Sequence, residues 1–197
     1  MIRKLEGLSE EELGKIRLLV GEAFVTNELF HNWGSLEERR EDVLKYMTVY
    51  VDFAYYSGEL YANEDMTGFI GLEDSKEKKA GPQLKMLVKL FTTLPFYRIK
   101  QLMSFINRIG DGNKKYAKTH HIDVLMVCVD KAHQGKGIAR ELVTFAKEMA
   151  DTKGVPLLMD TDMPSYAQMY EHMGCKIYNE IKADNGVTRY NLCYKGE

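Results

Sequence analysis

The sequence has few of the features that define several large classes of protein. Its 197 residues include only three cysteines, Cys128, Cys175 and Cys193. An odd number of cysteines without metal-ligand spacing predicts reduced thiols and gives no sign of a disulfide framework or a metal centre. The 27 basic and 29 acidic residues leave a net charge of −2. A chain with this balance lacks the positive field that attracts nucleic acid, so we expect no nucleic-acid partner.

Long apolar runs are also missing. No stretch approaches the roughly 20 apolar residues that span a membrane, and Met1 to Glu6 lack the apolar core of a secretory signal. We therefore expect a cytoplasmic protein with no membrane partner. The composition, 45% hydrophobic and 28% charged, is typical of a globular protein, and the length fits one domain over residues 1–197.

The most informative segment is a glycine-rich turn that follows an apolar run. Residues 121–129 (HIDVLMVCV) form the run, and the turn 134–139 (QGKGIA) comes after a short polar link. Apolar residues with helical spacing come next: Ile138, Leu142, Phe145 and Met149. A strand that leads through glycines into a helix N-terminus can hold a phosphate group, because the first helical amides lack partners and the helix dipole is positive there.

Two familiar glycine motifs do not fit this turn. A Walker-type loop ends in Gly-Lys-Ser/Thr, but here Gly137 is followed by Ile138, and no hydroxyl is placed to bind magnesium. A dinucleotide fingerprint needs three glycines, and only Gly135 and Gly137 are present, at another spacing. Nucleotidases and dinucleotide enzymes are therefore excluded. A turn that merely joins a strand to a helix remains the alternative to a phosphate site.

The spacing Gln/Arg-x-x-Gly-x-Gly/Ala is matched by Gln134, Gly137 and Ala139. It resembles the pyrophosphate loop of the GNAT superfamily of N-acetyltransferases, which bind acetyl-CoA as cosubstrate. The resemblance is good over residues 119–178 and otherwise rests on architecture. It implies an α/β (α+β) fold with a mixed central sheet of about six to seven strands flanked by helices. Met163 departs from the pattern, because many members have there an asparagine that contacts pantetheine.

A second motif lies downstream of the turn. Tyr166, Met169, Tyr170 and Met173 share one face of a predicted helix. Residues 170–175 (YEHMGC) resemble the family pattern Tyr-Glu-x-x-Gly-Phe, with Cys175 in place of the phenylalanine. The resemblance implies that Tyr170 protonates the departing thiolate, a step that suits a phenol with a pKa of about 10. The alternative is a tyrosine that only packs in the core.

The resemblance also assigns the cofactor contacts. Pantetheine is expected along Val127 to Val129, where the fourth and fifth strands splay apart, and the amide of Cys128 or Val129 is expected to stabilise the oxyanion. The expected cofactor-binding residues are Val127, Cys128, Val129, Gln134, Gly135, Lys136, Gly137, Ile138 and Ala139. Direct attack by an amine needs no acetyl-enzyme, so Cys128 is not assigned as a nucleophile.

An amine acceptor must lose a proton, so a base is expected. Asp123 precedes Val129 by six residues, at a position similar to that of the glutamate base in histone-type members, and His121 shares its strand face by parity. Asp160, at the end of the next strand, is a third candidate. Each of these residues could instead be a strand-end polar group bonded to a neighbouring loop.

Residues 83–111 form a helical insertion before the fourth strand. Two runs of apolar residues with helical spacing flank Pro95, and several lysines and arginines accompany them. The pair could lie on a membrane surface, bind a partner, cover an active site or pack as an ordinary helical hairpin. In some GNAT members an insertion at this place shapes the acceptor pocket.

Turn and cap signals complete the expected order of elements. Ser9 with Glu12, and Ser35 with Glu38, predict capping boxes, residues 24–33 read as a loop, and residues 58–62 and 66–72 read as strands. Asp184-Asn185-Gly186 predicts a final hairpin. The order is one strand, two helices, two strands, the insertion, strand, helix, strand, helix and two strands, which is the GNAT topology.

The predicted function is transfer of an acetyl group from acetyl-CoA to a primary amine of a small molecule, without a metal. One alternative is an acyltransferase that acts on a protein or peptide amine. Another is a non-catalytic CoA-binding domain that contacts a partner through the insertion. The chain is expected to be a monomer or a homodimer.

Overall fold

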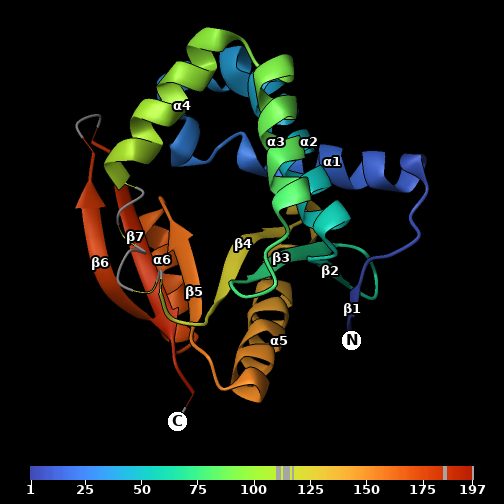
Figure 1. Ribbon diagram of the computed structural model, residues 1–197, viewed down its shortest axis with the longest axis vertical. Coiled ribbons are helices and arrows are strands. Elements are labelled where there is room, and N and C mark those ends of the chain that lie inside the picture. The colour runs from blue at the N-terminus through green and yellow to red at the C-terminus, as the bar shows by residue number, and fades with distance from the viewer. Residues whose placement is uncertain (110–111, 113–115, 117, 184–185, 197) are drawn as a thin grey trace.

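The computed structural model describes residues 1–109, 112, 116, 118–183 and 186–196. Within these residues a seven-stranded mixed sheet has the order β1-β2-β3-β4-β5-β7-β6 (Figure 1). The strands are β1 (Ile2–Lys4), β2 (Leu60–Asn63), β3 (Gly68–Asp74), β4 (Ile122–Val129), β5 (Leu157–Thr161), β6 (Lys176–Lys182) and β7 (Thr188–Tyr194). The helices are α1 (Glu10–Phe24), α2 (Leu36–Ser57), α3 (Ala80–Thr93), α4 (Phe96–Ile109), α5 (Ile138–Lys153) and α6 (Pro164–His172). The predicted fold class and element order are confirmed.

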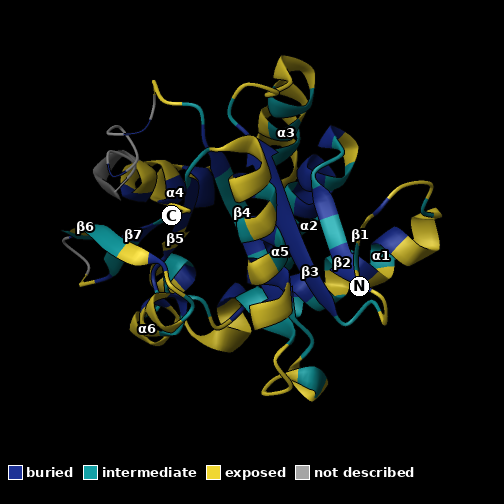
Figure 2. Ribbon diagram, turned by 90° about the horizontal axis from the view of Figure 1, so that it is seen from below, coloured by how far each residue is buried: buried dark blue, intermediate teal, exposed yellow. Residues whose placement is uncertain are grey.

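Helices cover both faces of the sheet and enclose two hydrophobic cores. α1 and α2 pack on one face, where Leu13, Val43 and Met47 meet β2, β3 and β4. α5 and α6 pack on the other face, where Leu142 and Tyr170 are buried. Figure 2 shows β3 buried along its whole length behind α5. A strand that is buried on both faces reads as an apolar run, which is why β3 and β4 are recognisable in the sequence.

Two helices begin where the capping boxes predict. The Ser9 side chain accepts from the Glu12 amide while Glu12 bonds back to the Ser9 amide, and Ser35 with Glu38 repeats the arrangement. The 24–33 segment is not a plain loop, because α1 extends to Phe24 and a 3-10 helix, η1, spans Glu28–Trp33. Asn27 caps η1 by accepting from the Leu29 amide, a local signal that the loop reading overlooked.

The central strands separate partway along the sheet. β4 pairs in parallel with β5 over only three positions, from Ile122 opposite Leu157 to Val124 opposite Met159. Beyond Val124, β4 continues to pair with β3 as far as Val129, but it no longer pairs with β5. The predicted splay of the fourth and fifth strands is therefore present. It leaves a gap between them, and among the described residues no strand pairs with this edge of β4 beyond Val124.

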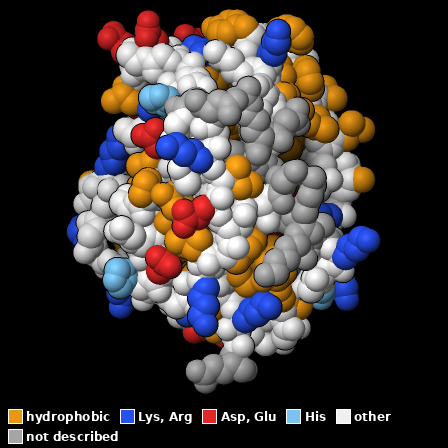
Figure 3. Space-filling model, turned by 90° about the vertical axis from the view of Figure 1, so that its left-hand side faces the viewer, with side chains coloured by type: hydrophobic (Ala, Val, Ile, Leu, Met, Phe, Trp, Pro, Cys, Tyr) orange, Lys and Arg blue, Asp and Glu red, His pale blue; other side chains and the backbone are white. Residues whose placement is uncertain are grey.

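The insertion forms the helices α3 and α4, which stand over the upper part of the molecule in Figure 1. Ion pairs tie it to α2: Lys89 Nζ lies 2.7 Å from Asp52 Oδ2, and Arg98 Nε lies 2.7 Å from Asp42 Oδ2. Its outer side is apolar, with exposed Leu84, Leu87, Val88, Phe91, Phe96 and Tyr97. In Figure 3 hydrophobic side chains gather along the top and upper right of one face, while acidic and basic side chains mix elsewhere.

The starts of two strands differ from the sequence prediction, and parts of two other predicted segments lie outside the described residues. The strands predicted at 58–62 and 66–72 are β2 and β3, which begin two residues later. β2 begins later because α2 runs to Ser57 and Gly58 ends it in a left-handed conformation. Before β3, the amides of Thr67 and Gly68 donate to the Asn63 side chain in a turn. Asp184 and Asn185 of the predicted hairpin, and residues 110–111 of the insertion, lie outside the described residues. In the described part of the chain, no helix combines the length and apolar character needed to cross a bilayer.

Candidate active site

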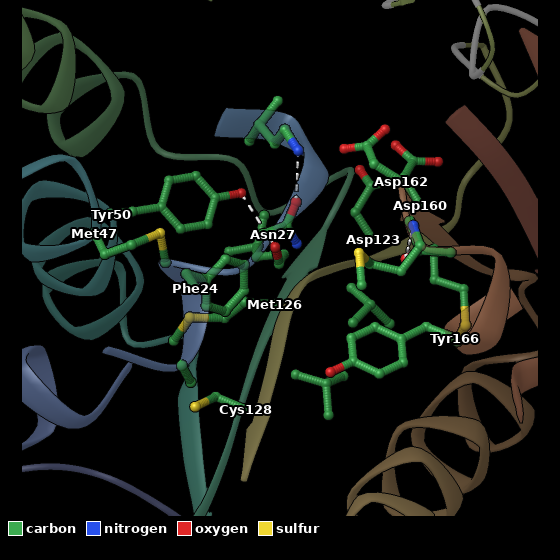
Figure 4. Close-up of a pocket in the computed structure, with 18 of the residues that line it drawn as sticks. Phe24, Asn27, Met47, Tyr50, Asp123, Met126, Cys128, Asp160, Asp162 and Tyr166 are labelled. Carbon is green, nitrogen blue, oxygen red and sulfur yellow. Dashed lines mark hydrogen bonds between the residues drawn. The ribbon is translucent and has the colours of Figure 1, made fainter. Parts of the chain in front are cut away.

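A cavity of about 470 Å³ passes through the gap between β4 and β5. It is lined from the α2 side by residues such as Met47 and Tyr50, and from the α6 side by Tyr166 and Tyr170. Because these residues belong to opposite faces of the sheet, the cavity connects the two faces. In Figure 4, Asp123, Asp160 and Asp162 group at one end of the cavity and Cys128 lies toward the other. The volume is in the range of small-molecule sites.

The glycine turn lies where β4 leads into α5. Gly135 and Gly137 have φ values of 78° and 84°, a left-handed conformation that favours glycine. Gly137 is the N-cap of α5, so the first amides of the helix follow it directly. Ile138 packs closely on β3, because a Cβ at Gly68 would lie 2.4 Å from its Cγ2 atom. The exposed turn thus has the form of an anion-binding helix start.

Of the nine expected cofactor-binding residues, four line the cavity. They are Val127, Cys128, Val129 and Gln134. The Gln134 side chain donates from Nε2 to the Val129 carbonyl at 3.3 Å, which joins the turn to the end of β4. Gly135 to Ala139 continue from this point along the rim and into α5. The structure therefore brings the expected strand edge and the expected turn together.

Tyr170 lies in α6 and lines the cavity from the α5 side of the sheet. Burial raises its pKa above the ordinary value, so the phenol keeps its proton. Tyr166, one turn earlier, also lines the cavity and is 45% exposed. From the sequence, Tyr166 is expected only on the apolar face of this helix and is not among the predicted site residues. Both phenols are within the same wall, and both are candidate proton donors.

Cys128 is a buried thiol on β4. Burial raises the pKa of Cys128 to about 12, with a further contribution from Asp130. A thiol with this pKa is protonated at neutral pH and is a weak nucleophile. This agrees with the expectation that Cys128 is not the acyl carrier.

His121 and Asp123 are in contact, as parity predicts. His121 Nδ1 lies 2.5 Å from the Thr119 carbonyl oxygen, which can only accept, so Nδ1 carries a hydrogen. His121 Nε2 lies 3.2 Å from Asp123 Oδ2. When the His121 ring is neutral, its one hydrogen is on Nδ1 and Nε2 has none. The contact between Nε2 and Asp123 Oδ2 is therefore a hydrogen bond only when one further proton lies between these two atoms. Asp123 lines the cavity and His121 is buried behind it.

Further charged groups lie at the end of the cavity that contains Asp123. Arg189 holds Asp162 through two bonds, Nε to Oδ1 at 2.6 Å and Nη2 to Oδ2 at 2.7 Å. Asp160 accepts from Asn191 Nδ2 at 2.6 Å, and burial raises the pKa of this carboxyl. Asp162 and Arg189 were not predicted as site residues. They are 27 residues apart, and only the pairing of β5 with β7 brings them together.

Lys78, between β3 and α3, lies at the same end of the cavity. Its ammonium lies 2.8 Å from Glu73 Oε2 and 3.3 Å from Asp123 Oδ2. In the described part of the chain, no group of three or more His, Cys, Asp or Glu side chains is placed to hold a metal ion.

Comparison with known proteins agrees with this geometry. Residues 97–176 match the family model described as an acetyltransferase (GNAT) domain. Over 68 residues the chain is 35% identical to an uncharacterized N-acetyltransferase of Schizosaccharomyces pombe. This similarity spans 33% of the chain and 28% of the yeast protein, so little more than a quarter of that relative's length is matched.

Solved structures of the same fold cover the whole chain. The crystal structure of a mosquito arylalkylamine N-acetyltransferase like 5b aligns with a TM-score of 0.61 at 14% identity, over 100% of this chain and 99% of the other. A structure described as histone acetyltransferase HPA2 and related acetyltransferase, from Corynebacterium glutamicum, aligns with a TM-score of 0.63 at 12% identity, over 100% and 96%. Residues 97–176 thus match a GNAT acetyltransferase domain, and the whole chain has the fold of these acetyltransferase structures.

Proposed function

We propose that this protein transfers an acetyl group from acetyl-CoA to a primary amine of a small molecule. The observation that carries the proposal is the cavity through the β4–β5 gap, which opens beside the glycine turn at the start of α5. One end of such a site suits a phosphorylated donor and the other suits a charged acceptor. The lining at the acceptor end has four carboxyl side chains, Glu73, Asp123, Asp160 and Asp162, and two cationic ones, Lys78 and Arg189, and this excess of acidic groups favours a cationic substrate.

The donor fits the residues present. The amides that follow Gly137 face an exposed rim without side-chain obstruction, because a Cβ at Gly135 or Gly137 would meet no atom within 4 Å. The edge of β4 at Val127 to Val129 has no strand partner in β5 and can bond an extended pantetheine arm as an added strand does. Acetyl-CoA would supply a thioester, an activated acyl group, at the level of Cys128.

The reaction would proceed by direct attack. The amine nitrogen bonds to the thioester carbonyl carbon, and the amide of Cys128 or Val129 stabilises the tetrahedral oxyanion. The carbon–sulfur bond then breaks, its electron pair goes to sulfur, and the Tyr170 phenol donates a proton to the thiolate. The protonated state of Tyr170 and the inert thiol of Cys128 both support this route.

The proton of the attacking amine would pass to the pair of Asp123 and His121. Asp123 faces the cavity, and a proton taken there can be shared with His121 Nε2 at 3.2 Å. His121 is fixed in the required orientation by its bond to the Thr119 carbonyl. The pair is therefore arranged to accept one proton, as a base and its relay would be.

The acceptor end is covered by the insertion, which supports a small acceptor. Leu102 and Ile106 of α4 line the cavity opposite the sheet. An extended peptide needs an open groove, whereas a compact amine fits under a helix. A peptide amine and a CoA-binding domain without turnover are the competing functions.

A panel of amines tests the proposal. Arylalkylamines, polyamines, aminoglycosides and short peptides would each be incubated with acetyl-CoA and the protein, and free thiol would be measured. We expect amine-dependent thiol release with at least one small amine and slower release with peptides. Faster turnover of peptides would favour transfer to a peptide amine. Tight binding of acetyl-CoA without turnover on any acceptor would favour a non-catalytic CoA-binding domain.

A further inference from the structure

The strand β4 contains an irregularity at the point where it leaves β5. Gly71 pairs with Met126 and the next residue of β3, Leu72, pairs with Val124, so Leu125 has no Cα partner in β3. This is a β-bulge, in which one extra residue bends the strand. The side chains of Leu125 and Met126 consequently lie on the same face of the sheet, both in the core beneath α1 and α2. The pairing of β4 with β5 ends at Val124, immediately before the bulge.

The bulge decides which residues face the cavity. Upstream of it Asp123 is on the α2 face of the sheet, and downstream Cys128 is on that face too. Without the extra residue the parity of the downstream segment would reverse, because side chains alternate along a strand. A slip of one residue would turn Cys128 toward α5 and would exchange the backbone groups of Val127 to Val129 that face β3 with those that face the gap.

A tyrosine of α2 contacts this irregularity. The Tyr50 hydroxyl donates to the carbonyl oxygen of Leu125 at 3.3 Å. The ring is held by its neighbours on the same helix: it stacks on Tyr46 at 6.0 Å between centroids and lies 6.3 Å from Phe53. Burial raises the pKa of Tyr50, so the hydroxyl remains a donor at neutral pH. Figure 4 shows Tyr50 directed from α2 toward β4.

The opposite strand leaves room for the extra residue. A Cβ at Gly71 would lie 3.2 Å from the Leu125 Cβ and 3.5 Å from Met126 Cγ. A side chain at this position would therefore press on the bulge and shift it by a few tenths of an ångström. Gly71 permits the irregular backbone, and Tyr50 fixes it in place.

We infer that Tyr50 is a positioning residue: by holding the Leu125 bulge, it keeps the edge of β4 turned toward the thioester. This inference rests on the proposed acetyl transfer. Its physical basis is that an oxyanion is stabilised only by amides held at the correct place. Tyr50 acts through the backbone of β4 and takes no part in the chemistry.

The test compares Tyr50→Phe with Tyr55→Phe. Both tyrosines are in α2 and both bond to backbone, since the Tyr55 hydroxyl accepts from the Leu8 amide at 2.8 Å, but Tyr55 is not in the wall of the cavity. For Tyr50→Phe we expect faster amide hydrogen exchange in residues 124–129 and a kcat lowered roughly three- to tenfold, the scale of one hydrogen bond, with the KM for the amine unchanged. Tyr55→Phe is expected to change neither quantity. Gly71→Ala is expected to act on the same segment in the same direction as Tyr50→Phe.

Two results would overturn the inference. If Tyr50→Phe raises only the KM for the amine and leaves exchange in β4 unchanged, the hydroxyl binds substrate and does not hold the bulge. If Tyr50→Phe and Tyr55→Phe behave alike, the hydrogen bond has no special effect. Should the wild-type chain transfer no acetyl group, the proposed function fails, and hydrogen exchange alone still decides whether Tyr50 holds the bulge.

Discussion

Among single residues, the Tyr170 phenol has the most defined expected effect. Removing its hydroxyl in Tyr170→Phe leaves the ring in the core and removes the proton donor. We expect kcat to fall about 100-fold, the lower range for general acid catalysis, with little change in the dissociation constant of acetyl-CoA. Steady-state kinetics and calorimetric titration measure the two quantities.

The control for this prediction is Tyr166→Phe, since Tyr166 lines the same cavity wall. Its effect on kcat is expected to be much smaller. The reverse order of the two effects would make Tyr166 the donor. Equal loss of turnover and of acetyl-CoA affinity in Tyr170→Phe would make Tyr170 a structural residue.

Asp123 and His121 give a second prediction at the scale of residues, which concerns the pH dependence of kcat/KM. If Asp123 accepts the amine proton, kcat/KM must fall at low pH as the pair takes up its proton from solvent. Asp123→Asn is expected to remove this acidic limb and to lower the rate about 100-fold. His121→Ala is expected to shift the limb, because it removes the partner at Nε2. Profiles of both variants that superimpose on the wild-type profile after scaling would exclude these residues as the base.

Among the elements, α5 offers a matched pair of glycines. Gly137 caps its N-terminus and Gly154 its C-terminus, both in the left-handed conformation, and a Cβ at either position meets no atom within 4 Å. Alanine at each position should therefore destabilise the fold by a similar amount, about 1 kcal/mol. Only Gly137→Ala is expected to weaken acetyl-CoA binding, by about tenfold, because it alters the turn that faces the phosphates. Equal affinities of the two variants for acetyl-CoA would place the phosphates elsewhere.

The elements also show what the sequence could predict. α5 and β4 were predictable because an amphipathic period and an apolar run are local signals. The Leu125 bulge was not, since it depends on Gly71 and Tyr50, which are distant in sequence. The same reason explains why Tyr170, which has a local motif, was predicted as a site residue and Arg189 was not. A contact between residues far apart in the sequence produces no repeating pattern of apolar residues in either segment, so it cannot be predicted from the local sequence.

At the scale of the whole molecule, Glu59 links stability to pH. Burial raises the pKa of Glu59 to about 7 from an ordinary value of 4.5. The folded state thus favours the neutral carboxyl, so the associated stability is complete below about pH 4.5 and is lost as the pH rises through 7. Glu59→Gln is expected to stabilise the protein at pH 8 relative to the wild type by about 1 kcal/mol, a figure reduced for solvent screening of this partly buried group, and to have little effect at pH 4.5.

Urea denaturation at the two pH values measures this difference. Glu64→Gln is the control, because the Glu64 side chain is 83% exposed, and it should behave like the wild type at both values. A gain in stability that is the same at pH 4.5 and pH 8 would show that Glu59 acts through packing and not through its charge.

The architecture of the whole chain assigns the donor more closely than the acceptor. The match to a GNAT domain, the strand gap and the glycine turn all bear on the proposed acetyl-CoA site, and the turn and the strand before it are continuous in sequence, at residues 121–139. The acceptor end is lined by residues of α2, α4, β5 and β7, which are far apart in the sequence. Its set of charged and apolar side chains is therefore known only from the three-dimensional structure.

The most direct measurement of the central claim is the initial-rate pattern with both substrates varied. Acetyl-CoA and the best amine of the panel would be titrated against each other while thiol release is followed. Direct attack within one cavity requires both substrates to be bound together, so double-reciprocal plots should give intersecting lines. Parallel lines, the kinetic sign of a covalent acyl-enzyme, or thiol release that does not depend on the amine, would contradict the account.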